Sequence, residues 1–209
     1  MSQPPLPIAV LISGSGTNLQ ALIDASHDDR FGCTLAVVIA DRADATGLGR
    51  AERAGIPVVV VDWAASATRE AFTSAICDAV DLSGAKAIVL AGFMRILSPA
   101  AIDRFPDAII NVHPALLPSF PGAHSVEQAL EHGVTVTGVT VHFVDEQVDH
   151  GPIIAQEAVA VRDGDNAESL HARIQAVEHT LLPRVVSAFG HGEIAVDGRL
   201  VHWNAREVA

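Results

Sequence analysis

Residues 7–20 read PIAVLISGSGTNLQ: an almost wholly apolar run, a glycine-rich turn and the start of an amphipathic segment. Short apolar runs rich in β-branched residues are typical of strands buried on both faces of a parallel sheet. Leu19, Leu22 and Ile23 fall at i, i+3 and i+4, which is the spacing of one helical face. The stretch therefore predicts a strand, a tight turn and a helix, the first unit of an α/β fold.

The same unit recurs along the first half of the chain. Four further short apolar runs, each bounded by Gly, Pro or Asp, occupy residues 35–40, 57–61, 87–91 and 108–112. Between two of these runs, Phe72, Ile76 and Val80 repeat at helical spacing. Repeated βα units predict a doubly wound, mostly parallel, Rossmann-like sheet, and ligands of such sheets bind at the carboxyl ends of the strands.

The pattern changes in the second half. Residues 134–143 and 153–161 alternate small polar and β-branched side chains, which predicts a C-terminal antiparallel extension of the sheet. A long helix follows, with Asn166 as its N-cap, and we expect Pro183 to kink or end it.

A last hairpin is expected from residues 193–196 and 199–203 around Asp197-Gly198, a strong turn dipeptide. Neither an internal repeat nor a linker divides the sequence. We therefore expect residues 1–209 to form a single domain with two halves, residues 1–105 and 106–209.

Charge and composition exclude several classes of function. The chain has 25 acidic and 13 basic residues, so its net charge is −12, and it has no Lys/Arg run to bind nucleic acid or a membrane surface. No apolar stretch reaches the about 20 residues of a spanning helix, and the start lacks signal-peptide features, so a cytoplasmic location is expected. Cys33 and Cys77 lie in apolar surroundings without metal-ligand spacing, which predicts core thiols and no metal.

The glycine turn is a candidate anion site. Backbone N–H groups and a helix N-terminus converge at Ser13-Gly14-Ser15-Gly16-Thr17, and we expect Gly14 to adopt a positive φ. A dinucleotide fingerprint would need Gly or Ala where Leu19 stands, and no P-loop lysine follows, so a single phosphate group is predicted. The alternative is a tight turn capped by Thr17 or Asn18.

Asp41 follows the second predicted strand, where a Rossmann protein holds a ribose hydroxyl. The other interpretation is a solvated loop acid beside Arg42, and the sequence favours this second interpretation.

Polar side chains also end the fifth predicted strand. Asn111 and His113 stand two apart, so they share one face, and Pro114 stops further pairing. A carboxamide that holds a developing oxyanion beside an imidazole that moves a proton suits acyl transfer. A satisfied core network is the alternative. The placement of these polar residues directly after an apolar strand favours chemistry.

A carboxylate that reaches His113 would raise the pKa of the imidazole and keep it cationic. The turn-rich residues 145–152 offer three acids for this role, namely Asp145, Glu146 and Asp149, and the residues alone leave open which one acts.

Several motifs together resemble one family. They are SGSGTNLQ at 13–20, GFMRIL at 92–97, NVHP at 111–114, LLP at 116–118, HF at 142–143, VD at 148–149, and Gln175 with Glu178 and His179. In this order they are similar to the phosphoribosylglycinamide formyltransferases, folate-dependent enzymes of purine synthesis. The resemblance covers nearly the whole chain. It implies direct transfer of a formyl group from 10-formyltetrahydrofolate to the amine of 5-phosphoribosylglycinamide, without a metal.

The resemblance also assigns roles. His113 would be the general acid, Asn111 would hold the formyl oxygen, and Asp149 would raise the pKa of His113 and help relay protons. The first half would bind the ribonucleotide phosphate, and the second would carry catalysis and folate binding. The ribonucleotide residues would be Gly14, Ser15, Gly16, Thr17, Asn18, Gln175, Ala176, Val177 and Glu178. The folate residues would be Arg69, Met94, Arg95, Ile96, Leu97, Asn111, Asp145, Glu146, Gln147, Val148 and Asp149.

Two residues depart from the family pattern, and several other classes of protein are alternatives to this interpretation. His150 stands where many relatives have Gly, and Ser119 where a Lys is common. Methionyl-tRNA formyltransferase and formyltetrahydrofolate deformylase share the three catalytic residues but carry an additional domain, so we expect neither. A nicotinamide-dependent oxidoreductase is favoured by Asp41 and opposed by Leu19, and a non-catalytic nucleotide sensor is a third class. A homodimer is left open.

Overall fold

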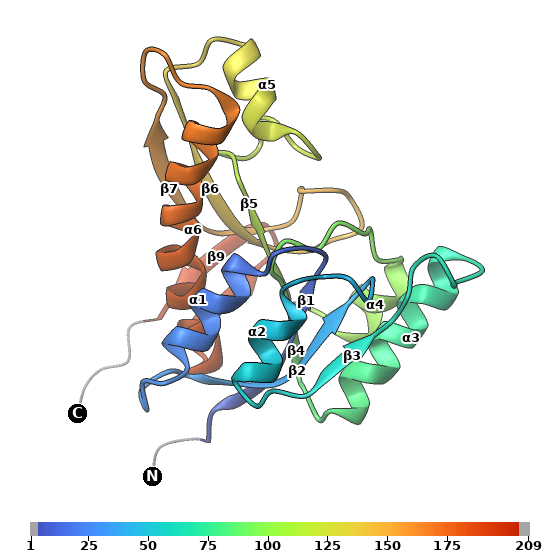
Figure 1. Ribbon diagram of the computed structural model, residues 1–209. Coiled ribbons are helices and arrows are strands. Elements are labelled where there is room, and N and C mark those ends of the chain that lie inside the picture. Colours follow the sequence, from blue (N-terminus) through green and yellow to red (C-terminus); the bar gives the residue numbers. More distant parts are fainter. Residues whose placement is uncertain (1–3, 205–209) are drawn as a thin grey trace.

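The computed structural model describes residues 4–204, which form a seven-stranded sheet with helices on both faces and a separate two-stranded hairpin (Figure 1). The sheet order is β3-β2-β1-β4-β5-β6-β7. Strands β1 to β5 are parallel, and β6 and β7 extend the sheet antiparallel beyond β5. The strands are β1 Leu6–Ile12, β2 Cys33–Ala40, β3 Val58–Val60, β4 Ala87–Leu90, β5 Ile109–His113, β6 Val136–Phe143 and β7 Ile153–Ala160. The predicted α/β fold, doubly wound with an antiparallel extension, is confirmed.

Helices cover the two faces of the sheet unequally (Figure 1). On β1, Ile8 and Val10 pack into a core with α1, α2 and α6, whereas Ala9 and Leu11 pack against Phe72 of α3 on the opposite face. This alternation explains why β1 is apolar at every position. The helices are α1 Thr17–Ala25, α2 Leu48–Arg53, α3 Arg69–Leu82, α4 Pro99–Arg104, α5 Ser125–Glu131 and α6 Ala167–Gly190.

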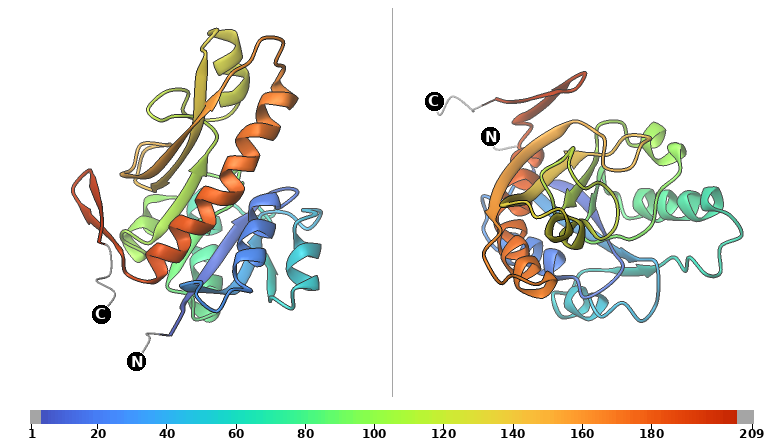
Figure 2. Two further views of the ribbon diagram at one scale, coloured as in Figure 1. Left: turned by 90° about the vertical axis from the view of Figure 1, so that its left-hand side faces the viewer. Right: turned by 90° about the horizontal axis from the view of Figure 1, so that it is seen from above.

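The long helix α6 runs along one face of the sheet (Figure 2). Its predicted N-cap is confirmed, because Asn166 Oδ1 accepts a 2.8 Å hydrogen bond from the Ser169 N–H. Pro183 does not end the helix, which continues to Gly190, so of the two expected effects, a kink or an end, the end is wrong. Leu182, Pro183 and Val186 are all buried, and packing of this apolar face offsets the hydrogen bond that a proline cannot donate.

The predicted terminal hairpin is present as β8 Ile194–Asp197 and β9 Leu200–Trp203. Its turn lies one residue later than expected, because Asp197 pairs with Leu200 and Gly198-Arg199 make the turn. Gly198 has a φ of 59°, and a glycine suits the first turn position when that position needs a positive φ.

The loops after β1 and β4 lie at the point where the strand order reverses, the usual ligand site of such sheets. Here the Ser13 N–H donates to Gly92 O at 3.2 Å, and the Met94 N–H donates to Ser13 Oγ at 2.8 Å. Next to them, Asn111 of β5 is level with Leu90, the last residue of β4. The two loops and the end of β5 therefore meet at one edge of the sheet.

Both cysteines are buried and free, as predicted, and burial raises the pKa of the Cys33 thiol to about 12. None of the helices between residues 4 and 204 has the length and apolar character needed to cross a membrane.

Candidate active site

Asn111, His113 and Asp149 meet at the end of β5. Asp149 Oδ2 lies 3.3 Å from His113 Nδ1, and Asp149 Oδ1 accepts a 3.3 Å hydrogen bond from Asn111 Nδ2. One carboxylate therefore contacts both strand residues. The sequence left three acids open, and the structure selects Asp149, since Asp145 pairs with His150 at 2.6 Å and Glu146 is exposed.

His113 is buried, with 4% of its surface exposed. Its second nitrogen, Nε2, lies 2.8 Å from the carbonyl oxygen of Phe120, so both ring nitrogens face acceptors. Burial nevertheless lowers the pKa of His113, outweighing the Asp149 carboxylate and the Phe120 carbonyl, which act in the opposite direction. The Asp149 carboxylate raises the pKa of the imidazole, as expected, but burial acts more strongly in the opposite direction.

The Asp149 carboxylate is held ionised. Burial raises its pKa, but the neighbouring His142, the Gly122 N–H and His113 together outweigh burial and leave the pKa below its ordinary value. The Gly122 N–H donates to Asp149 Oδ2 at 2.7 Å, and Asp149 itself has a positive φ of 51°. The loop that carries Asp149 is thus fixed against the loop that follows β5.

His142 on β6 is a further member of the cluster. Its Nδ1 donates to Phe143 O at 2.7 Å, which leaves Nε2 as the acceptor for Asn111 Nδ2 at 3.1 Å. His142 also lies 3.6 Å from Asp149 Oδ1 and is buried. It therefore fixes the orientation of the Asn111 carboxamide.

The glycine loop presents uncapped backbone N–H groups. Gly16 is the N-cap of α1, with a φ of 67° and no capping side chain, so the alternative of a turn capped by Thr17 or Asn18 is wrong. Gly14 has no positive φ, which corrects that expectation, and a Cβ there would meet open space. The Gly47 N–H holds the loop by donating to Gly14 O at 2.9 Å.

Helix α6 supports the loop from the other side. Gln175 Nε2 donates to Thr17 Oγ1 at 2.9 Å, and Asn18 Nδ2 donates to Glu178 Oε2 at 3.0 Å. Glu178 is only 5% exposed, and burial raises the pKa of its carboxyl group, although the Asn18 hydrogen bond acts against this. A buried acid of α6 thus faces the glycine loop.

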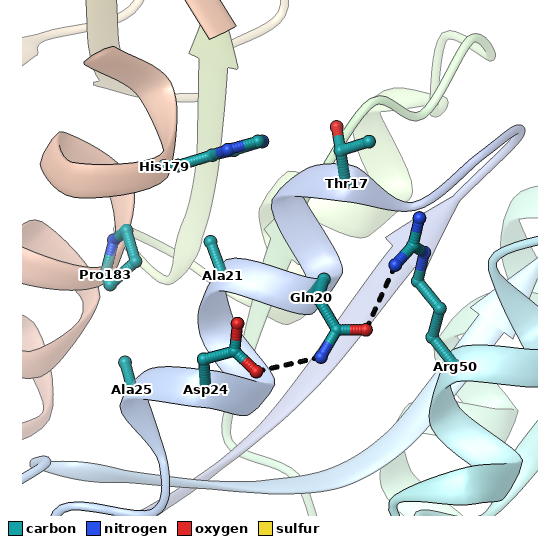
Figure 3. Close-up of a pocket in the computed structure, with 8 residues that line it drawn as sticks. All are labelled: Thr17, Gln20, Ala21, Asp24, Ala25, Arg50, His179 and Pro183. Carbon is teal, nitrogen blue, oxygen red and sulfur yellow. Dashed lines mark hydrogen bonds between the residues drawn. The ribbon is translucent and has the colours of Figure 1, made fainter. Parts of the chain in front are cut away.

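A pocket of about 520 Å³ opens between α1, α2 and α6 beside Thr17 (Figure 3). Arg50 reaches in from α2 and donates to Ser15 O at 2.8 Å and to Gln20 Oε1 at 3.1 Å. His179 of α6 faces it, and its Nε2 is buried without a hydrogen-bond partner in the part of the chain described. Burial, and secondarily the Arg50 charge, lower the pKa of His179. The pocket is lined by Thr17, Gln20, Ala21, Asp24, Ala25, Arg50, His179 and Pro183.

The segment after β4 exposes two apolar side chains, Met94 at 70% and Ile96 at 55%, while Leu97 is buried. Arg95 turns inward, and its Nε donates to Asp41 Oδ2 at 2.6 Å. Asp41 is 1% exposed, so the interpretation as a solvated loop acid is wrong. Arg42, its chain neighbour, pairs instead with Asp44 at the surface.

Comparison with known proteins identifies the family. Residues 6–186 match the family model described as formyl transferase. This chain belongs to the formyl transferase family. It is 44% identical over 199 residues to phosphoribosylglycinamide formyltransferase of Escherichia coli (strain K12), covering 95% of this chain and 91% of that protein. The corresponding protein of Mycobacterium tuberculosis (strain CDC 1551 / Oshkosh) is 43% identical, with 93% and 90% covered.

Solved structures agree with this assignment of the formyl transferase. A crystal structure of glycinamide ribonucleotide transformylase 1 from Symbiobacterium toebii superposes with a TM-score of 0.93 at 48% identity, covering 95% of this chain and 94% of that chain. The resemblance stated from the sequence motifs is therefore confirmed, and the protein is an enzyme of this family.

The structure joins several of the residues predicted for the site by direct contacts: Asp149 contacts Asn111 and His113, and Gln175 and Glu178 contact Thr17 and Asn18. Among the other predicted residues, Ala176 is exposed, Val177 packs against the core, and Arg69 lies at the surface 3.7 Å from Glu70. Three residues of the site had no predicted role: His142, His179 and Arg50. The two histidines were part of motifs noted in the sequence, His142 in HF at 142–143 and His179 next to Glu178. Nothing in the sequence marked Arg50, which resembles any exposed residue of a short helix.

Within residues 4–204 of the formyl transferase, no group of three or more His, Cys, Asp or Glu side chains is arranged to hold a metal ion. The division into halves, the cytoplasmic location and the oligomeric state stay predictions.

Proposed function

We propose that this formyl transferase moves the formyl group of 10-formyltetrahydrofolate to the glycinamide amine of 5-phosphoribosylglycinamide in de novo purine synthesis. The amine attacks directly, through a tetrahedral intermediate. One observation carries the proposal: the Asp149 carboxylate joins Asn111 and His113 at the end of β5, on the same edge of the sheet as the glycine loop. The names of the similar proteins support the choice of substrates.

Asn111 supplies the donor for the oxygen that gains charge. In the free protein its Nδ2 donates to His142 Nε2 and, over a longer 3.3 Å, to Asp149 Oδ1. The longer bond is the one that exchanges for the formyl oxygen. Because His142 already fixes the carboxamide, little reorganisation is needed when the negative charge develops.

His113 moves the proton. The amine nitrogen bonds to the formyl carbon, the bond from that carbon to N10 breaks, the amine loses one proton and N10 gains one. A neutral imidazole accepts the first proton and returns it to N10, so it finishes each turnover as it began. Asp149 stabilises the imidazolium that exists in between. The lowered pKa of His113 in the free protein fits this role of proton carrier.

The ribonucleotide phosphate is assigned to the uncapped N–H groups of residues 14–17. Arg50 and His179 add donors in the adjoining pocket (Figure 3). Local attraction is needed because the chain carries a net charge of −12. Glu178 accepts hydrogen bonds from the ribose hydroxyls, which would complete the pairing of its buried carboxylate. Residues 1–105 accordingly form the ribonucleotide half, joined by residues 175–178 of α6.

Formyl folate is assigned to the side of Asn111, His113 and Asp149 that faces away from the ribonucleotide. Met94 and Ile96 offer an apolar slot for the pterin, residues 145–149 form its rim, and Arg69 provides a cation for the glutamate tail. Residues 106–209 accordingly contain the catalytic trio and this rim.

The test is a transfer assay with both substrates, with each one omitted in turn. Formylated ribonucleotide is expected only when both are present. Formate released from formyl folate without the ribonucleotide would indicate a hydrolase instead. Tight binding of NADH in place of both substrates would indicate an oxidoreductase.

A further inference from the structure

The segment at residues 92–97 crosses the carboxyl edge of the sheet and is fixed at two points. At its start, Ser13 at the end of β1 accepts the Met94 N–H and donates its own N–H to Gly92 O, at 2.8 Å and 3.2 Å. One residue later, Arg95 passes over the end of β1 and reaches Asp41, which directly follows β2.

Asp41 and Arg95 form a partly buried ion pair. Arg95 Nε lies 2.6 Å from Asp41 Oδ2, and the Asp41 side chain is completely buried. The guanidinium also lies over the Trp63 ring, 5.3 Å from its centroid. The backbone N–H of Trp63 donates to the backbone oxygen of Asp41 at 3.0 Å. Trp63 in turn packs edge-on against the buried Phe72. The ends of β2 and β3 thus hold one side chain of the segment rigidly.

A single inward side chain determines where its neighbours point. With Arg95 anchored, Met94 and Ile96 on either side of it are the exposed apolar residues of the segment. Buried Asp41 Oδ1 has no hydrogen-bond partner within residues 4–204, so Arg95 provides the main compensation for this buried charge. Breaking the ion pair would leave the Asp41 carboxylate buried without a partner charge, so the contact is energetically favoured.

We propose that Asp41 is a positioning residue for formyl folate: through Arg95 it orients Met94 and Ile96 toward the pterin. The inference rests on the proposed function and deepens it. In this proposal Arg95 does not bind folate directly, because its guanidinium already contacts Asp41 and Trp63. Its role is to hold the segment in position. Asp41 is buried beneath Arg95 and therefore affects folate through it.

The experiment compares Asp41→Ala with Asp41→Asn, whose amide oxygen still accepts from Arg95 Nε. Calorimetry measures the affinity for 10-formyltetrahydrofolate and, separately, for 5-phosphoribosylglycinamide. We expect Asp41→Ala to weaken folate binding about tenfold, the loss of one charge-assisted contact. Asp41→Asn should stay within about threefold of wild type, and ribonucleotide affinity within about twofold in both. In steady-state assays the effect should appear in KM for folate and leave kcat nearly unchanged.

Asp44→Ala is the matched control, because Asp44 forms an exposed ion pair with Arg42 in the same loop. It should alter neither affinity. If Asp41→Ala does not fold, the double variant Asp41→Asn with Arg95→Ala removes the contact without leaving a buried charge, and the same tenfold loss for folate is expected. Unchanged folate affinity in Asp41→Ala, or equal losses for both substrates, would overturn the positioning role. Wild-type protein that binds no formyl folate would instead overturn the proposed function.

Discussion

Glu178 Oε2 and Asn18 Nδ2 are joined by a 3.0 Å hydrogen bond across 160 positions of the sequence. The bond connects the last long helix to the first turn of the first helix, and a second one from Gln175 Nε2 to Thr17 Oγ1 runs parallel to it. Helix α6 therefore shapes the glycine loop, although the two lie at opposite ends of the chain. A buried carboxylate in this place costs stability, which implies that it is retained for binding.

Replacing this carboxylate should stabilise the protein at neutral pH and weaken ribonucleotide binding. The raised pKa of Glu178 means that its favourable contribution is present below the unfolded pKa of about 4.5 and is lost as pH rises through the folded pKa. We expect Glu178→Gln to increase the free energy of unfolding at pH 7 by about 1 kcal/mol. This gain should shrink toward pH 4. Denaturant titrations at both pH values measure it, and calorimetry measures ribonucleotide affinity.

Glu157→Gln is the control, since Glu157 is exposed on β7 and should change stability little. A Glu178→Gln variant that is less stable than wild type at pH 7 would show that the carboxylate supports the fold and would remove the argument for a ribose ligand.

His113→Ala should remove most turnover while the protein stays folded. The imidazole moves a proton only during the reaction, so kcat is expected to fall by on the order of 10² to 10⁴ with smaller changes in either affinity. His124→Ala serves as the control because that imidazole is exposed and makes only a 3.9 Å contact with Glu127. Near-normal turnover in His113→Ala, with circular dichroism unchanged, would refute the mechanism.

Asp149→Asn should move the pKa of His113 further down. Asp149 is the larger of the two influences that raise this pKa against burial, the other being the Phe120 carbonyl, so its neutral replacement lets burial act with less opposition. NMR titration of the imidazole measures the shift, and turnover is expected to drop by on the order of 10². Asp145→Asn should leave the His113 titration in place, because Asp145 pairs with His150. A shift of equal size in both variants would mean that Asp149 is not the specific partner.

Local sequence signals were sufficient for the sheet and for the center of the site. The apolar runs located β1 to β5, and the two-residue spacing of Asn111 and His113 predicted that both side chains share one face. Which of three acids joins them became known only from the structure. These signals succeed because strand periodicity and strand ends are local properties.

Long-range contacts account for what the sequence reasoning missed. Asp41 lies in a loop with acidic and basic neighbours, and only the crossing of Arg95 over β1 explains its burial. Pro183 stays inside α6 because packing of a buried face outweighs a local helix-breaking tendency. The sign of the His113 pKa shift depends on the balance between burial and a partner charge, and burial is a property of the folded chain.

The two glycines of the loop should respond differently to valine. Gly16 has a φ of 67°, and a Cβ there would lie 2.8 Å from Gly47 Cα, so Gly16→Val should lower the free energy of unfolding by about 2 kcal/mol or more. Gly14 has neither constraint, so Gly14→Val should unfold like wild type. Its isopropyl group would nevertheless fill the space that a phosphate needs beside the helix N-terminus.

Calorimetry on Gly14→Val is therefore expected to show at least about tenfold weaker ribonucleotide binding, a loss of about 1.4 kcal/mol, with formyl folate unaffected. Inorganic phosphate should compete weakly with the ribonucleotide in wild-type protein and not in this variant. The opposite result, intact ribonucleotide affinity with lost folate affinity, would reverse the assignment of the glycine loop. The two substrates would then lie in the opposite direction across the strand ends, and the buried acid on α6 would face folate.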